Sequence, residues 1–169
     1  ILKTSIQTMK YCTKCGKTLT KKVIDQKERL CCVDNSCGFI YWNNPIPVVG
    51  IVVETDKGII LAHNKLAPKE IFSIITGFLE ADELPEIAAQ RETKEELGLD
   101  AVETNFLGIF PFAKANQIVI AYHIVATGNI ELNEELDEYK IVQKTELLDY
   151  TKNNKFEVQE WLNKLNVLK

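Results

Sequence analysis

The sequence lacks several features that would place it in a specialised class of protein. No stretch approaches the roughly 20 consecutive apolar residues of a membrane-spanning helix, and the first ten residues lack the apolar core of a signal peptide. The chain contains no internal repeat and no low-complexity tract. Its formal net charge is −4, so no general excess of positive charge marks a nucleic-acid-binding protein. We therefore expect a soluble, cytoplasmic protein with no membrane partner.

Cysteine is absent from the last three quarters of the chain. The five cysteines are Cys12, Cys15, Cys31, Cys32 and Cys37. This segregation favours a metal site over disulfides. Two close pairs, Cys12 with Cys15 and Cys32 with Cys37, have the spacing of knuckles that clasp one tetrahedral Zn²⁺. We expect these four to bind a structural zinc and Cys31 to be a spare thiol; the alternative is a set of buried cysteines without metal.

The composition also divides the chain into parts. We interpret residues 1–9 as an N-terminal extension, 10–44 as a zinc ribbon too poor in apolar residues to hold a core unaided, and 45–169 as the main domain. With 169 residues, 46% of them hydrophobic, the chain can supply one core and a small appendage.

The main domain has an α+β pattern. β-branched runs predict a hairpin over 48–53 and 59–61, a short strand over 71–75, paired strands over 106–112 and 118–127, and a strand near 139–142. Residues 86–97, ended by Gly98, predict a helix, and 156–169 predict a closing amphipathic helix. Because strands and helices interleave without a regular βαβ period, we expect a mixed sheet flanked by helices.

The first of these helices is unusually acidic. Its neighbourhood contains five glutamates against two basic residues, a local charge of −3: Glu83, Glu86, Glu92, Glu95 and Glu96, with Arg91 and Lys94. Glu92 lies three residues before Glu95 and four before Glu96, so like charges crowd one face. A divalent cation such as Mg²⁺ or Mn²⁺ would reverse the repulsion. The alternative is a solvated acidic face without function.

The wider pattern resembles the Nudix box, a glycine-led loop, helix and turn. The matching residues are Gly77, Glu83, Arg91, Glu92, Glu95, Glu96 and Gly98, and they cover all seven fixed identities of the signature. Thr93 stands where an aliphatic residue is usual, and Leu84 where a polar helix cap is common. The resemblance implies a Nudix fold, an α/β/α sandwich with a mixed sheet, and a hydrolase that uses Mg²⁺ or Mn²⁺.

The same resemblance implies roles for individual residues. Glu92, Glu95 and Glu96 would hold the catalytic metal, and Glu96 would help to activate water. Arg91 and Glu83 would pair to fix the loop against the helix, and Gly77 would permit the tight loop.

A zinc ribbon before a Nudix domain resembles the NADH pyrophosphatase branch. In that branch a downstream glutamate supplies a further metal ligand; Glu135 matches this position better than Glu134 or Glu138. The loop residues Phe78 and Glu80, and Trp42 near the end of the ribbon, match substrate-binding positions. The branch's Ser-Gln-Pro-Trp-Pro-Phe-Pro signature is missing, since 109–117 retains only Pro111 and an aromatic residue.

We therefore expect a small-molecule nucleotide substrate with a diphosphate linkage, such as NADH, NAD, a similar dinucleotide or ADP-ribose. NAD-capped RNA fits the same resemblance. A different class of function, a nucleotide-sensing or RNA-binding module without turnover, is the alternative. The ribbon either staples its own lobe or pairs two subunits as a homodimer. His63 and His123 are interpreted as ordinary, partly buried residues.

Overall fold

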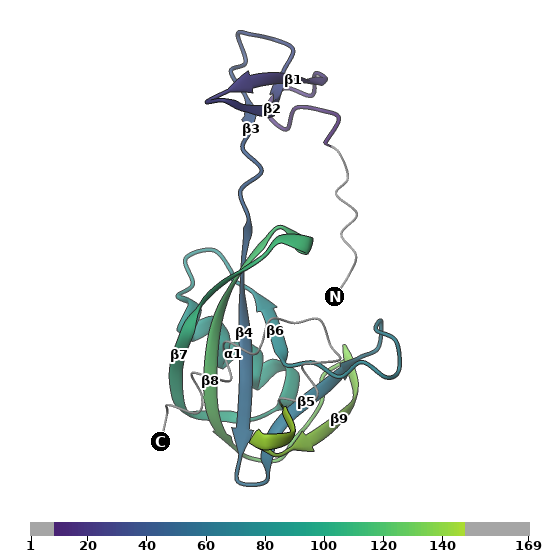
Figure 1. The fold of residues 1–169 in the computed structure, drawn as a ribbon, viewed down its shortest axis with the longest axis vertical. Coiled ribbons are helices and arrows are strands. Elements are labelled where there is room, and N and C mark those ends of the chain that lie inside the picture. Colours follow the sequence, from purple (N-terminus) through teal and green to yellow (C-terminus); the bar gives the residue numbers. More distant parts are fainter. Residues whose placement is uncertain (1–8, 148–169) are drawn as a thin grey trace. The chain divides into compact units, whose positions relative to one another are not determined.

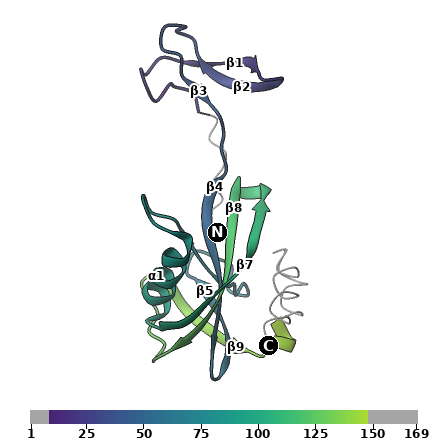
Figure 2. The same ribbon diagram turned by 90° about the vertical axis from the view of Figure 1, so that its left-hand side faces the viewer.

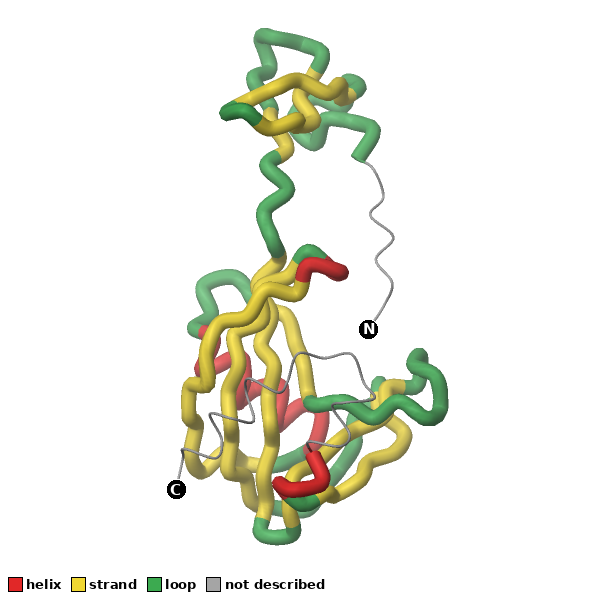
Figure 3. Tube along the Cα trace, viewed as in Figure 1, coloured by secondary structure: helices red, strands yellow, loops and turns green. Residues whose placement is uncertain are grey.

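The computed structural model describes residues 9–147 and divides the chain into two compact units, one ending at Pro45 and the other starting at Ile46 (Figure 1). Strands dominate both units (Figure 3). No helix in the described part of the chain is long and apolar enough to cross a membrane.

The N-terminal unit is an antiparallel three-stranded sheet. Its strands are β1 (Leu19–Ile24), β2 (Lys27–Cys32) and β3 (Ile40–Tyr41), in the order β1-β2-β3. Asp25 and Gln26 join β1 to β2, and both have positive φ, as a two-residue hairpin turn of the right twist requires. The short turn fixes the register, so Lys22 lies directly opposite Arg29.

The larger unit is built on a six-stranded mixed sheet. Its strands are β4 (Ile46–Thr55), β5 (Gly58–Asn64), β6 (Ile75–Phe78), β7 (Asp100–Phe112), β8 (Gln117–Thr127) and β9 (Leu136–Val142). The order is β7-β8-β4-β5-β9, with β6 pairing the first half of β4. Only the β4–β8 pairing is parallel; the other pairs are antiparallel. The expected mixed sheet is confirmed.

Both faces of β4 are apolar, because it runs through the middle of the sheet. Val48 and Val52 belong to one core cluster, and Val49, Ile51 and Val53 to the other. This explains the continuous β-branched run in the sequence, since a strand buried on both faces cannot alternate apolar residues with polar ones.

Helix α1 (Pro85–Leu97) covers the second of these faces (Figure 2). Pro85 stands at its first turn, where a missing N–H costs nothing. Leu84 provides no side-chain cap, as its apolar chemistry predicts. Thr93 is fully buried, and its hydroxyl donates to the Ala89 carbonyl at 2.8 Å, which satisfies its polar atom. Gly98 ends the helix with φ 71°.

Three expected elements differ from the structure or lie outside it. The strand expected over 71–75 is wrong: β6 begins at Ile75, and Ser73 forms only an isolated bridge with Ala62. The strand expected from 106 begins at Asp100, because β7 follows β8 along most of its length through two register shifts. The closing helix expected over 156–169 lies outside the described residues.

Candidate active site

An ion-paired arginine joins α1 to the loop that precedes it. The Arg91 guanidinium donates from Nε to Glu83 Oε1 at 2.8 Å and from Nη2 to Glu83 Oε2 at 2.9 Å. Nη2 also donates to the Phe78 carbonyl at 3.1 Å, and Glu83 accepts the Glu80 backbone N–H at 3.0 Å. Hydrogen bonds from Arg91 lower the pKa of Glu83 to about 2. These contacts fix the loop against the helix.

Gly77 lies where this loop meets the acidic face of α1. A Cβ added at Gly77 would overlap the carboxyl end of Glu92. The glycine is therefore required for close packing, and its φ does not lie in the left-handed region. The position of the Glu92 carboxylate depends on the absence of a side chain at residue 77.

We expect Gly77→Ala to displace the Glu92 carboxylate and to weaken Mn²⁺ binding by about 10- to 100-fold, as loss of a supporting contact at a metal site typically does. Isothermal titration with Mn²⁺ measures the affinity. Thr76→Ala, at the exposed neighbouring position of β6, is the matched control and should bind as the wild type does. Equal Mn²⁺ affinity in Gly77→Ala and Thr76→Ala would show that Glu92 is not a ligand.

The carboxylates of α1 gather around Arg91 and Glu96. Arg91 Nη1 contacts Glu92 Oε1 at 2.8 Å and Glu95 Oε2 at 3.0 Å, so one guanidinium offsets two negative charges. Glu96 is only 9% exposed, and no described residue forms an ion pair or hydrogen bond with its carboxylate. Burial, with the negative charges of Glu92, Glu135 and Glu95, raises the pKa of Glu96 to about 8.

This donor set fits a hard divalent cation. A buried carboxyl group with negative neighbours and no cation must otherwise hold a proton. Mg²⁺ and Mn²⁺ prefer several oxygen ligands and would compensate Glu96 together with the exposed Glu95. The residues that would hold such an ion are Glu92, Glu95, Glu96 and Glu135. In the described residues no three of these carboxylates have oxygens within 4.8 Å of one another, so binding an ion would have to draw them together.

The segment around Glu135 is tied to the loop after β5. The Lys65 backbone N–H donates to the Glu135 carbonyl at 3.0 Å, and Lys65 Nζ donates to the Glu134 carbonyl at 2.6 Å. His63 Nδ1 lies 2.6 Å from Asp137 Oδ1. We call these contacts of Lys65 and His63 the clamp. The sequence did not predict the clamp, because its partners lie about 70 residues apart and no local pattern connects them.

We expect His63→Gln to lower the unfolding midpoint by roughly 3–5 °C at pH 6, and by less at pH 9. In the structure Nδ1 faces Asp137 and Nε2 lies 3.2 Å from the Pro68 carbonyl, so only protonated His63 donates to both acceptors. The Asp137 hydrogen bond raises the pKa of His63. Its stabilisation is therefore complete below the unfolded-state pKa and is lost as the pH rises through the raised value.

Thermal unfolding of His63→Gln across this pH range measures the effect. Asp137→Asn should reproduce it, whereas Glu138→Gln, at the next exposed position of β9, should not. A destabilisation that does not change with pH would contradict a role for charged His63.

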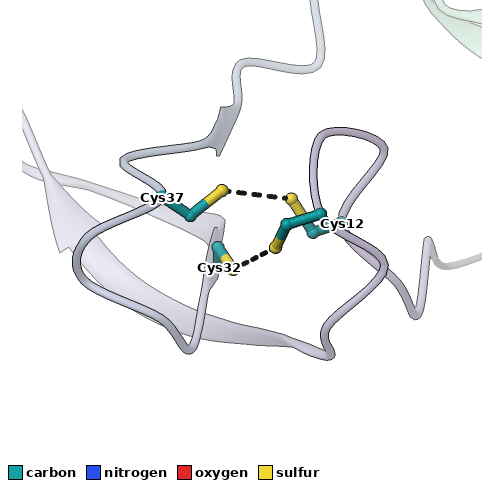
Figure 4. Close-up of side chains that lie close together, drawn as sticks. Cys12, Cys32 and Cys37 are labelled. Atoms are coloured by element: carbon teal, nitrogen blue, oxygen red, sulfur yellow. Dashed lines mark hydrogen bonds between the residues drawn. The ribbon is translucent and has the colours of Figure 1, made fainter.

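A second ligand cluster lies in the N-terminal unit. The Sγ atoms of Cys12, Cys15, Cys32 and Cys37 all lie within 4.8 Å of one another. The Sγ–Sγ distances are 3.7 Å for Cys12–Cys37 and 3.5 Å for Cys15–Cys32. Figure 4 shows the labelled side chains pointing toward one another. Tetrahedral Zn²⁺ with Zn–S bonds of about 2.3 Å requires sulfurs about 3.8 Å apart, so the cluster fits zinc.

The thiols also need a cation for an electrostatic reason. Backbone N–H groups of Cys15 and Lys14 overcome burial and lower the pKa of Cys12 to about 7. Burial and the neighbouring cysteines raise the pKa of Cys32 to about 12. Four thiolates at this spacing would repel one another, and a divalent cation removes that repulsion. Cys31 is buried outside the cluster, as the spare thiol was expected to be.

The expected substrate-binding residues lie in different units. Phe78 and Glu80 belong to the loop pinned by Arg91, and the Phe78 side chain is exposed. Trp42 belongs to the N-terminal unit, where Arg29 covers its ring. His63 and His123 are both buried, and each is hydrogen-bonded to a carboxylate, Asp137 and Glu54 respectively; neither belongs to a metal-ligand group in the described residues.

Comparison with known proteins finds similar sequences. NAD-capped RNA hydrolase NudC of Vibrio atlanticus is 28% identical over 116 residues, 69% of this chain and 42% of that protein. The mitochondrial NAD(P)H pyrophosphatase NUDT13 of Mus musculus is 28% identical over 130 residues, 76% of this chain and 36% of that protein. The chain thus spans about two fifths of the length of the curated relatives it matches.

The same fold is found among solved structures. A solved NUDIX hydrolase from Nitrosomonas europaea superposes with a TM-score of 0.70 at 22% identity, covering 82% of this chain and 80% of that one. The family model described as the NUDIX domain matches residues 44–162, which include β4 to β9, α1 and every acidic residue of the candidate site. The chain therefore belongs to the NUDIX domain family.

Proposed function

We propose that this chain is a metal-dependent hydrolase of the diphosphate linkage in nucleoside diphosphate compounds, with NADH, NAD, a similar dinucleotide or ADP-ribose as substrate. Residues 45–169 form its catalytic domain and residues 10–44 a zinc ribbon. The observation that carries the proposal is Glu96, a buried carboxylate among negative charges with no cation among its described neighbours.

Glu92, Glu95, Glu96 and Glu135 would hold Mg²⁺ or Mn²⁺. Such an ion neutralises the diphosphate and lowers the pKa of the attacking water. The protein's own groups fix the geometry: Arg91 holds the loop through Glu83 and the Phe78 carbonyl, and Gly77 leaves room for Glu92. The exposed Phe78 ring, 61% accessible, is available to stack on a substrate base, with Glu80 beside it.

Glu96 would accept the proton of the attacking water. Without a metal its pKa is about 8, and a bound cation would lower that value and keep the carboxylate ionised, ready to accept a proton. The water oxygen bonds to one phosphorus, the bridging P–O bond of the anhydride breaks, and two phosphate-containing products leave. No cysteine or serine nucleophile takes part.

Two curated relatives support the class of substrate. One is named for hydrolysis of NAD-capped RNA and the other for cleavage of NAD(P)H, and both linkages are nucleoside diphosphates. NAD-capped RNA is therefore included in the proposal as a substrate, beside the free dinucleotides.

The test is a substrate panel. NADH, NAD, ADP-ribose, flavin dinucleotide, diadenosine polyphosphates, nucleoside triphosphates and an NAD-capped RNA are incubated with Mg²⁺ or Mn²⁺, and the products are separated by chromatography. We expect two phosphate-containing products from a dinucleotide only when the divalent ion is present. Glu95→Gln should lower turnover far more than it alters folding, whereas the exposed Glu86→Gln, on the same helix, should not. Equal activity in all three proteins would remove the box from the mechanism.

The second candidate, a sensing or RNA-binding module without turnover, predicts binding of the same nucleotides with no product. The intact set of carboxylates favours the enzyme, since a sensor has no need of a buried, metal-competent Glu96. Tight binding of ADP-ribose without cleavage, in either metal, would establish the sensor.

A further inference from the structure

The net charge of −4 conceals a division of charge between the two units. Residues 10–45 contain seven Lys and Arg against three Asp and Glu, a formal charge of +4. Residues 46–169 contain 12 against 21, a formal charge of −9. The larger unit is therefore acidic, whereas the ribbon carries an excess of positive charge, as a nucleic-acid-binding surface does.

The strand register places on one face three of the ribbon's cations that form no ion pair within the described residues. Opposed residues in an antiparallel sheet share a face, so this face consists of Thr20, Lys22, Ile24, Lys27, Arg29, Cys31, Ile40 and Trp42. We call it the Lys22 face. It contains three cations and no acidic residue. Of the ribbon's three acids, Glu28 pairs with Lys21 at 2.6 Å on the opposite face, Asp34 pairs with Lys17 at 2.7 Å, and Asp25 lies in the turn between β1 and β2.

Two cations stand directly opposite each other on this face. Lys22 pairs with Arg29 in the register, and like charges in opposed positions destabilise a sheet. No described carboxylate relieves them: Lys22 Nζ donates to the neutral Asn35 side chain at 2.9 Å, and Arg29 Nη1 donates to the Trp42 carbonyl at 2.9 Å. Arg29 Nε is buried and has no partner among the described residues. An anion placed over the face would relieve this repulsion.

An aromatic ring adjoins the cations. The Arg29 guanidinium lies 4.5 Å from the centroid of the Trp42 ring, a cation–π contact, and Trp42 is still 45% exposed. A flat, partly exposed indole beside several cations suits a nucleobase next to its phosphate, because base stacking and phosphate neutralisation act together in single-strand binding. An acidic peptide would use the cations and leave the indole without a stacking partner, and a duplex has no unpaired base to offer.

We propose that the Lys22 face of the ribbon binds single-stranded nucleic acid, with Lys22, Lys27 and Arg29 on phosphates and a base stacked on Trp42. The zinc centre lies away from this face, because Cys32 points opposite to Cys31 in β2. This inference stands on the ribbon alone and does not depend on the proposed hydrolase function.

The test uses the full zinc-loaded chain without magnesium or manganese. Fluorescence anisotropy measures binding of a short, 5′-labelled single-stranded RNA of mixed sequence between about 50 and 200 mM salt. Three phosphate contacts predict a slope of log K against log salt of about −2, so that affinity falls about 15- to 20-fold over this range. Lys22→Gln with Lys27→Gln should reduce the slope to about −0.7.

The matched control carries the same loss of charge on ion-paired lysines. Lys17→Gln with Lys21→Gln should leave the slope unchanged, because Asp34 and Glu28 already neutralise those lysines. Trp42→Ala should weaken binding at least about fivefold, and Trp42→Phe should retain most of it. Zinc content, measured for every variant, identifies any that fail to fold.

Four results would overturn the proposal. They are no binding of the wild type at the lowest salt, equal binding of a duplex of the same length, equal binding of polyglutamate, and the same change of slope in both double variants. The second and third would assign the face to duplex nucleic acid and to an acidic protein respectively.

Discussion

Glu96→Gln is expected to lower turnover by about 10²- to 10⁴-fold and, at the same time, to stabilise the metal-free protein at alkaline pH. The wild-type carboxyl group has a pKa of about 8 because it is buried near Glu92, Glu135 and Glu95. Above that pH it must carry an uncompensated buried charge. Each tenfold change in proton affinity corresponds to about 1.4 kcal/mol, so the wild type loses on the order of 5 kcal/mol that a neutral amide does not lose.

The direction of the pH dependence follows from the raised pKa of Glu96. Because the folded protein holds this proton more tightly than the unfolded chain, the stability of the wild type falls as the pH rises from about 4.5 through about 8. Chemical denaturation of metal-free protein should therefore show no advantage of Glu96→Gln at pH 5 and a clear advantage at pH 9. Saturating Mg²⁺ should reverse the order, since the ion stabilises only the protein that binds it.

The reaction rate of Glu96→Gln should also fall. Loss of a group that accepts the proton of water typically lowers the rate by about 10²- to 10⁴-fold. Glu86→Gln, an exposed position of the same helix, is the control and should change neither stability nor rate. If Glu96→Gln destabilised the metal-free protein at pH 9, Glu96 would not be the strained, metal-competent carboxylate described above.

Removal of zinc is expected to unfold the N-terminal unit and to leave the larger unit folded. Both apolar core clusters of the described chain lie in the larger unit, from Val48 onward, so the ribbon has no core of comparable size. In zinc-finger peptides a structural zinc site contributes about 10–16 kcal/mol at neutral pH, which is folding free energy. Hydrogen exchange after treatment with a chelator should show loss of protection in β1 and β2 and retained protection in β4 and β8.

Single cysteine variants identify the ligands. Cys32→Ser should lose zinc and reproduce the chelated state, whereas Cys31→Ser, at the adjacent buried position, should keep one zinc per chain. If Cys31→Ser lost zinc and Cys32→Ser retained it, the two cysteines would exchange roles. Protection that survives chelation would show that the ribbon does not need a metal to fold. Sedimentation of the zinc-loaded and chelated protein would also report whether the ribbon pairs two subunits.

Local rules predicted much of this molecule. The two cysteine pairs predicted the cluster that includes Cys32, because close spacing in the chain is also close spacing in space. The helix over 86–97 followed from side-chain propensities and its terminal Gly98, and the structure has it at Pro85–Leu97. These features depend on interactions within a few turns or one hairpin, which a sequence displays directly.

Strand limits were harder to predict. β6 forms at Ile75–Phe78 because β4 offers a free edge there, and β7 extends back to Asp100 because β8 continues beside it. Neither partner is visible from the strand's own residues. The clamp of His63 and Lys65 on the segment around Glu135 is of the same kind, since it depends on β5 lying next to β9.

The sequence by itself determined the chemistry available: four thiols that gather in one cluster, a set of carboxylates on one acidic helix, and a chain that folds as a mixed sheet. Only the tertiary structure decided that the carboxyl group of Glu96 is buried without a cation while that of Glu95 is exposed. It also decided on which face of the ribbon the cations lie. The physical reason is that proton affinity and charge repulsion depend on neighbours in space, which strand pairing and packing bring together from distant parts of the chain.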